Sequence, residues 1–371
     1  MTNNENWYLL ENPERIPSPA LLIYPDRVRN NIDLMIRIAG DVKRLRPHVK
    51  THKLPELVAL QLSCGIKKFK CSTIAEAEMT AENGGQDVLL AYQPVGPHIE
   101  RFFQLKRAFP EVSFSTLVDN TEILKQLTLA AEKNEMPFDL YVDIDNGMHR
   151  TGIGISDGAF DLIRKIRSLP VVSFAGLHVY DGHIHESDPN LREKECRRDF
   201  KPVVRLIRKL KDLGIEVPHL VAGGTPTFPI HAKFQERELS PGTPLLWDMG
   251  YSSSFSDLKF QHAAVLLSRV ISQPQDVNLC LDLGYKAVSA DKSHPRVSFF
   301  GVESFTTLNQ SEEHLVIHPA EESGLVVGDV VYGIPAHICP TVALYDDAHI
   351  VENHKCTGSW KIVGRTRKIT V

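Results

Sequence analysis

The chain has 371 residues, of which 42% are hydrophobic and 24% charged, and its formal net charge is -4. Because one domain typically holds ~100–200 residues, this length predicts one large domain and a smaller one. The composition is typical of a globular protein, and the charge gives no reason to expect nucleic acid or an anionic membrane as a partner. No apolar run approaches the ~18–20 residues of a membrane-spanning helix.

The amino-terminal segment is polar and lacks the apolar core of a secretory signal peptide. The chain contains 6 cysteines, and no two of them form a Cys-x-x-Cys pair. A long chain without a secretion signal is expected to be reduced rather than cross-linked by disulfides. We therefore expect a cytoplasmic protein.

Strand-like apolar runs alternate with helical patterns through the first two-thirds of the chain. Apolar residues at helical spacing predict one helix over 28–39, stopped by Gly40, and another over 203–213, stopped by Gly214. Strands are expected at residues 20–24, 46–50, 68–72, 88–92, 113–118, 140–144, 172–180, 219–223 and 244–248.

This alternation predicts an α/β fold with a parallel sheet covered by helices. The many strand–helix units, without a nucleotide-type glycine fingerprint, favour a closed (β/α)8 barrel over an open doubly wound sheet. After about residue 250 the pattern changes to β-rich segments without convincing helices between them. These segments predict a second, mostly antiparallel β domain.

The stretch "LRPHVKTHK" concentrates groups that can carry or move protons. Its lysines are Lys50 and Lys53. A lysine that faces a barrel interior has its pKa lowered by burial, and the unprotonated amine can form a Schiff base with a carbonyl cofactor. A solvent-exposed loop is the alternative interpretation. Arg46, His48 and His52 would shape the pocket of such a lysine or support the fold.

Two further patterns could bind ligands. Gly223, Gly224 and Thr225 follow a predicted strand, so their backbone N–H groups could cradle a phosphate, although such a glycine pair is often only a turn. His337 and Cys339 are two residues apart, so their side chains would point the same way on an extended segment. Imidazole and thiolate form a natural zinc pair that leaves positions open for water or substrate, but chance pairs of this kind are common.

The ordered set of motifs resembles the D-threonine aldolase / D-serine dehydratase family of fold type III pyridoxal-phosphate enzymes, relatives of alanine racemase. The motifs are "IPSPALLIYPDRVRNNI", "LRPHVKTHK", "KCSTIAEAE", "DIDNGMHRTGI", "GLHVYDGH", "GGTPT", "ELSPGT" and "PAHICPTVALYD". The resemblance implies a pyridoxal-phosphate-binding (β/α)8 TIM barrel of the alanine racemase type over residues 26–250, with strands between about Arg46 and Trp247. Residues 1–25 and 251–371 would form the β domain, which would include the strand at 20–24.

The resemblance also implies the cofactor site. Lys50 would carry pyridoxal phosphate, with Lys53 on the following turn. Arg150 would hold the cofactor's phenolate oxygen ionised, because a guanidinium is permanently charged. Tyr180 would contact the pyridine ring, or else be a core tyrosine. The residues expected around the cofactor phosphate are Gly223, Gly224, Thr225, Gly242 and Thr243.

His337 and Cys339 match the family's paired metal ligands. The divalent ion would act as a Lewis acid on the substrate's β-hydroxyl group. A thiolate ligand favours zinc over the harder manganese and magnesium ions, which stay possible. By analogy with alanine racemase, the protein is expected to be a homodimer.

The family acts on D-β-hydroxy amino acids, and two reactions compete. The tyrosine in "GLHVYDGH" resembles the aldolase branch, in which His183 or His185 would be the base for cleavage to glycine and an aldehyde. The His-x-Cys pair resembles the dehydratase branch, in which Lys50 would remove the Cα proton of D-serine or D-3-hydroxyaspartate to give a keto acid and ammonia. Pro244 also replaces a tyrosine expected after "SPGT". We favour the aldolase narrowly over the dehydratase, and both over a racemase or a non-catalytic cofactor carrier.

Overall fold

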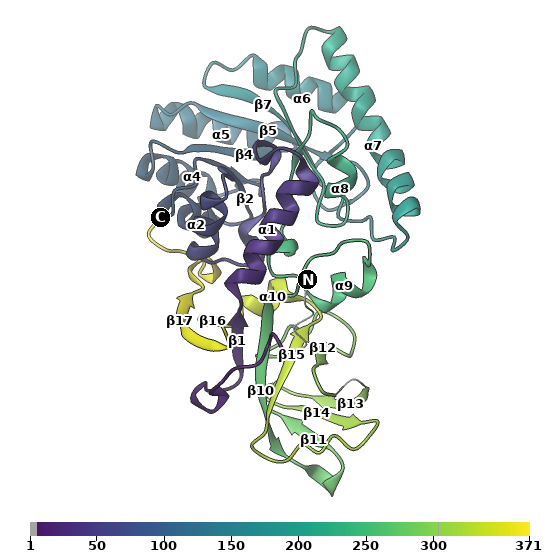
Figure 1. The fold of residues 1–371 in the computed structure, drawn as a ribbon. Coiled ribbons are helices and arrows are strands. Elements are labelled where there is room, and N and C mark those ends of the chain that lie inside the picture. Colours follow the sequence, from purple (N-terminus) through teal and green to yellow (C-terminus); the bar gives the residue numbers. More distant parts are fainter. Residues whose placement is uncertain (1–5, 303) are drawn as a thin grey trace. The chain divides into compact units, whose positions relative to one another are not determined.

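The computed structural model describes residues 6–302 and 304–371, which form two compact units (Figure 1). The larger unit comprises Asp33–Lys50, Pro55–Gly242 and Val363–Val371. The smaller unit comprises the described residues up to Ile32, together with Thr51–Leu54 and Thr243–Ile362.

The centre of the larger unit is a sheet of parallel strands. Its order is β2 (Lys68–Cys71), β3 (Asp87–Leu90), β4 (Ser113–Val118), β5 (Phe138–Asp145), β7 (Val172–Val179), β8 (His219–Ala222) and β9 (Glu238–Leu239), with β6 (Ile153–Gly154) beside the end of β5. The segment 45–48 bridges Leu45 to Leu239 and His48 to Lys70, both in parallel register. This segment joins the first strand to the last, so the predicted barrel is confirmed.

Helices connect these strands. They are α2 (Pro55–Ser63), α3 (Ile74–Glu82), α4 (Pro97–Ala108), α5 (Thr121–Asn134), α6 (Asp157–Arg167), α7 (Pro189–Asp212) and α8 (Phe228–His231). The predicted helix over 203–213 is the second half of α7, which begins earlier because the Asp188 carboxylate caps it by accepting from Asn190 N at 2.8 Å. The predicted helix over 28–39 is also confirmed, as α1 (Pro25–Ala39), and Gly40 ends it with a φ of +77°.

The expected strand over 244–248 is wrong. A 3-10 turn at Thr243–Leu245 and the helix α9 (Met249–Ser254) occupy this region, and β9 takes the last place in the barrel. Pro244 has no N–H to give to a sheet ladder. Asp248 instead caps α9, because its Oδ1 accepts from Tyr251 N at 2.9 Å.

A buried ionic network ties the barrel strands together on the side where they begin. The Arg46 side chain is 0% exposed, and its guanidinium contacts both carboxylate oxygens of Asp87 at 2.7 and 2.8 Å. The same guanidinium donates to Glu238 Oε2 at 2.8 Å. Glu238 also pairs with Lys68 and His219. Arg46 therefore joins the closing segment to β3 and to β9.

The smaller unit is built on a nine-stranded sheet. Its main path is β13 (Phe305–Gln310), β14 (Leu315–Pro319), β11 (Leu279–Leu281), β10 (Ala264–Ser272), β1 (Ala20–Ile23), β16 (Asp347–Glu352) and β17 (Lys355–Lys361), and β15 (Val330–Pro335) pairs with β10 and β12 (Val297–Phe299). Only the pairing of β1 with β16 is parallel among the described strands of this sheet. The predicted mostly antiparallel domain is therefore confirmed, with the strand at 20–24 inside it. No helix in the described part of the chain has the length and apolar character needed to cross a membrane.

Candidate active site

Lys50 lies at the carboxyl end of the segment that closes the barrel. It belongs to the 3-10 turn Val49–Thr51, and its backbone N–H donates to Nδ1 of His48 at 3.3 Å. Its side chain is half-buried. The lysine therefore occupies the edge of the barrel at which the parallel strands end, where functional groups of such barrels gather.

A second lysine in the barrel was not singled out by the sequence analysis. Lys70 on β2 is 2% exposed, and its Nζ lies 5.6 Å from the ring centroid of Tyr180. Burial, with the added repulsion of Lys50, lowers the pKa of Lys70 to about 7. The available sequence signal was its place between two apolar residues, Phe69 and Cys71, inside a predicted buried strand.

The side chains of Arg150 and Tyr180 lie close together. The guanidinium carbon of Arg150 lies 5.0 Å from the ring centroid of Tyr180. The loop that carries Arg150 is shaped by Asp145, whose Oδ1 accepts from Gly147 N at 2.9 Å and from His149 N at 3.0 Å. A guanidinium beside an aromatic face at the end of β5 can bind an anionic oxygen of a ligand.

The structure distinguishes the two candidate bases. His185 is exposed, whereas His183 is half-buried and its Nε2 lies 3.1 Å from Asp199 Oδ2 on α7. A hydrogen bond from Arg198, together with that from His183, lowers the pKa of Asp199 despite partial burial. An ionised Asp199 accepts the Nε2–H, so Nδ1 of His183 keeps its lone pair, and this buried atom has no hydrogen-bond partner within the described residues. Asp199 lies on a charged helix face, and no local sequence signal indicates its role.

The glycine turn after β8 is compact. Gly223 adopts a φ of +80°, and its N–H donates to Val179 O at 3.1 Å. A Cβ on Gly224 would lie 3.0 Å from the Tyr180 ring, so a side chain there would crowd it. Thr225 Oγ1 accepts from Gly242 N at 3.3 Å, which joins two of the predicted phosphate-binding segments. The turn and Tyr180 therefore lie at the same end of the barrel.

In the smaller unit, the side chains of the predicted metal ligands His337 and Cys339 are hydrogen-bonded to each other, but the segment that carries them is not an extended strand. His337 is the residue before α10 (Ile338–Val342), and Cys339 lies in its first turn. The expectation of an extended segment is wrong because Asp248 Oδ2 accepts from Ile338 N at 3.0 Å and so supports a helix start. Thr243 also belongs to this unit, where its Oγ1 lies 3.6 Å from Cys339 Sγ.

The chemistry of this pair fits a divalent ion. Burial alone would raise the pKa of Cys339, but its hydrogen bond to His337 and the charge of that ring lower it, which favours thiolate. Nδ1 of His337 lies 2.6 Å from Asp291 Oδ2, so Nε2 is the ring nitrogen available to a metal. The sequence analysis missed Asp291, which is distant from the pair along the chain.

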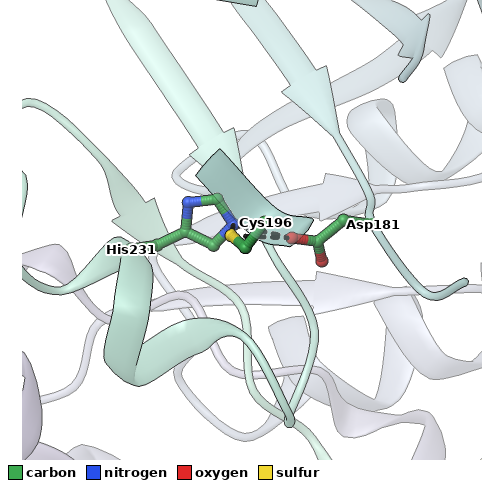
Figure 2. Close-up of side chains that lie close together, drawn as sticks. All are labelled: Asp181, Cys196 and His231. Atoms are coloured by element: carbon green, nitrogen blue, oxygen red, sulfur yellow. Dashed lines mark hydrogen bonds and ion pairs between the residues drawn. The ribbon is translucent and has the colours of Figure 1, made fainter. Parts of the chain in front are cut away.

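Three other side chains with metal-binding atoms gather in the larger unit. Figure 2 shows Cys196 and His231 beside the carboxylate of Asp181, and all three are buried. Asp181 belongs to "GLHVYDGH", but no spacing in the sequence connects it to the other two.

Residues 23–248, more than half of the chain, match the family model described as "Alanine racemase, N-terminal domain", and residues 263–351 match "Putative serine dehydratase domain". D-threonine aldolase of Arthrobacter sp is 29% identical over 95% of this chain and 93% of its own length. D-serine dehydratase of Dictyostelium discoideum is 26% identical over 91% of this chain and 93% of its own length.

A solved structure agrees with these matches. The crystal structure of D-threonine aldolase from Filomicrobium marinum matches this fold with a TM-score of 0.88 and 26% identity, over 94% of this chain and 96% of that one. These relatives comprise aldolases and a dehydratase, which are all lyases. The chain therefore belongs to the alanine racemase N-terminal domain family, with a domain of the serine dehydratase type following its barrel.

Proposed function

We propose that this protein is a lyase that uses pyridoxal phosphate and a divalent metal ion to cleave D-β-hydroxy amino acids into glycine and an aldehyde. The observation that carries the proposal is the meeting of Tyr180 with Arg150 and Gly224 at the end of the barrel where Lys50 lies. The likeness to D-threonine aldolase over almost the whole chain supports the same reaction.

The residues of the barrel fit the cofactor. Lys50 would bind its aldehyde, Arg150 would pair with its phenolate oxygen, and the glycine turn with Gly242 would hold its phosphate. The fit is supported by Gly224, where a Cβ would lie 3.0 Å from the Tyr180 ring that is expected to contact the cofactor. When bound, the cofactor supplies a conjugated ring that accepts the electron pair released as Cα–Cβ breaks.

His183 is the base in this proposal. Its Nδ1 lone pair takes the proton of the β-hydroxyl group, the C–O bond becomes a carbonyl, and the Cα–Cβ bond breaks. Asp199 keeps the ring in the tautomer with hydrogen on Nε2 and stabilises the imidazolium that forms. His183 is preferred to His185 because the His185 side chain is exposed, whereas His183 is half-buried and hydrogen-bonded to Asp199.

His337 and Cys339 would hold the metal ion, with Asp291 fixing the imidazole. The ion would polarise the β-hydroxyl group and lower its pKa. Zinc is favoured by the thiolate, and manganese or magnesium would bind this pair less well.

Dehydration of D-serine or D-3-hydroxyaspartate is the second candidate. The thiolate of Cys339 favours it, because in the resemblance a His-x-Cys pair belongs to dehydratases. Lys50 would then remove the Cα proton, and the β-hydroxyl would leave with help from the ion. The likeness to D-serine dehydratase supports this reading at slightly lower identity.

The two reactions give different products, so one assay separates them. Purified protein with pyridoxal phosphate and zinc, manganese or magnesium is incubated with D-threonine, D-serine and D-3-hydroxyaspartate, and aldehyde and keto acid are measured separately. We expect aldehyde and glycine from D-threonine, none from L-threonine, and loss of activity with a chelator. Keto acid without aldehyde would favour the dehydratase, and neither product with any metal would refute a lyase.

We also infer a cytoplasmic homodimer. All 6 cysteines are free thiols in the structure, which is the state expected in a reducing compartment. The dimer rests on the analogy with alanine racemase, and sedimentation velocity would test it.

A further inference from the structure

A buried chain of hydrogen bonds runs behind the glycine turn. Asp181, which follows β7, is 2% exposed, and its Oδ2 lies 2.7 Å from Nε2 of His231 at the end of α8. Nδ1 of the same ring lies 2.8 Å from Nη1 of Arg237, which is 4% exposed. The guanidinium carbon of Arg237 lies 4.0 Å from the ring centroid of Phe200 and 3.8 Å from that of Phe234. The chain therefore has three members that solvent hardly reaches.

Arg237 fixes the direction of each hydrogen bond. A guanidinium can only donate, so Nδ1 of His231 accepts. The ring then carries its hydrogen on Nε2, and this N–H donates to Asp181. Each ring nitrogen of His231 therefore has a partner in the chain, and the tautomer of the ring is set by these two neighbours.

The direction of these hydrogen bonds argues against a metal ion bound by His231. Asp181, Cys196 and His231 place ligand atoms within 4.8 Å of one another, and these are residue types that bind zinc. An ion on Nε2 would require hydrogen on Nδ1. That hydrogen would meet the N–H of Arg237. Burial also raises the pKa of the Cys196 thiol, which opposes a thiolate ligand.

The other oxygen of Asp181 reaches the glycine turn. Oδ1 accepts from Gly224 N at 3.2 Å and from Thr227 Oγ1 at 2.7 Å. The turn also packs closely against the imidazole of His231, since a Cβ on Gly223 would lie 2.6 Å from Cδ2 of that ring. Asp181 and His231 therefore both lie against the glycine turn.

We propose that Asp181 is a positioning residue whose carboxylate, oriented by the Arg237–His231 pair, holds the glycine turn in the shape that binds the cofactor's phosphate. The inference rests on the proposed function in one respect, which is that this turn is the phosphate site. The carboxylate does not contact the ligand. It acts by keeping the backbone of Gly224 in place.

The test uses a change that conserves size but reverses one donor. In Asp181→Asn, the amide NH2 faces Nε2–H of His231, so two donors meet at a buried contact. If the ring moves its hydrogen to Nδ1, the clash passes to Arg237. An unmade hydrogen bond of this kind corresponds to roughly tenfold to hundredfold weaker binding of pyridoxal phosphate.

A second substitution should relieve the first. In Arg237→Gln the amide can donate or accept, so we expect this variant alone to weaken the binding of pyridoxal phosphate less than Asp181→Asn does. In the double variant the ring can carry its hydrogen on Nδ1, donate to Gln, and accept from Asn at Nε2. Affinity should therefore recover to within about threefold of the wild type, since every buried polar group is again paired. Losses that add, or a double variant as weak as Asp181→Asn, would overturn the proposal.

Nitrogen NMR of ¹⁵N-histidine-labelled protein gives a direct readout, with the His231 signals identified by their absence in His231→Gln. We expect the Nε2–H tautomer in the wild type and the Nδ1–H tautomer in the double variant. The Nδ1–H tautomer in the wild type would refute the proposed hydrogen bonds from Arg237 through His231 to Asp181, even if Asp181→Asn failed to fold. Stoichiometric zinc that is lost in Cys196→Ser would refute it as well.

The affinity cycle uses pyridoxal phosphate and inorganic phosphate as separate probes. If the wild type shows no lyase activity, the proposed function fails, while the NMR and phosphate measurements still decide on Asp181. If the wild type is active but the losses of affinity in Asp181→Asn and Arg237→Gln add in the double variant, only the positioning role of Asp181 is refuted.

Discussion

Replacement of Arg46 by methionine should strongly destabilise the barrel. The guanidinium is completely buried and binds Asp87 on β3 and Glu238 on β9, so it ties the closing segment to both strands. Removing one partner of a buried ion pair costs about 3–5 kcal/mol, because a buried charge is left uncompensated. The side chain of Asp87 is 31% exposed and can be hydrated, and Glu238 keeps Lys68 and His219. We therefore expect the lower end of the range, about 3 kcal/mol.

The pH dependence of this variant adds an independent check. Burial alone would raise the pKa of Glu238, but the hydrogen bond from His219 and the charges of Arg46 and Lys68 hold it well below its usual range. A depressed carboxyl pKa contributes stability above the unfolded value of about 4.3, and this stability is lost as pH falls below it. The loss on acidification should be shallower in Arg46→Met, which has less of this stabilisation to lose.

Urea unfolding followed by circular dichroism at several pH values measures both effects. Arg46→Lys is the matched control, since it keeps the charge but cannot form the two-pronged contact with Asp87. Its loss should be smaller than that of Arg46→Met. A loss below about 1 kcal/mol for the methionine variant at pH 7 would contradict the argument, because that is the size of an exposed pair.

Three further predictions concern the candidate site. His183→Gln should lower kcat for D-threonine cleavage about 10²–10⁴-fold with a small change in KM, and equal activity of this variant and the wild type would exclude His183 as the base. Asp199→Asn should lower kcat less than His183→Gln does and should alter the pH profile of kcat. Lys70→Met should stabilise the protein at pH 7, because the pKa of Lys70 is about 7 in the folded protein and about 10.4 in the unfolded chain, so folding is penalised as the pH falls between these values. The gain in the free energy of unfolding should vanish near pH 10. Denaturant titrations measure it, with Lys67→Met at an exposed position as the control. Asp291→Asn should weaken zinc binding about 10–100-fold in chelator competition, and unchanged affinity would remove this residue from the metal site.

The sequence by itself determined the two-part architecture and the identity of the family. Helical spacing indicated the helix that ends at Gly40, and it indicated the second half of α7. Strand patterns indicated the parallel barrel and the antiparallel domain. The helices and strands follow from local periodicity, because a residue's neighbours along the chain decide which face it can bury. The family was indicated by the ordered set of motifs.

Only the tertiary structure decided which polar groups meet. Arg46 and Glu238 are 192 residues apart, and the contact that closes the barrel depends on both. The same holds for the partnership of His183 with Asp199 and for the chain from Asp181 to Arg237. Hydrogen bonds of buried groups are satisfied by whatever the fold brings near, so their partners leave no periodic signal in the sequence.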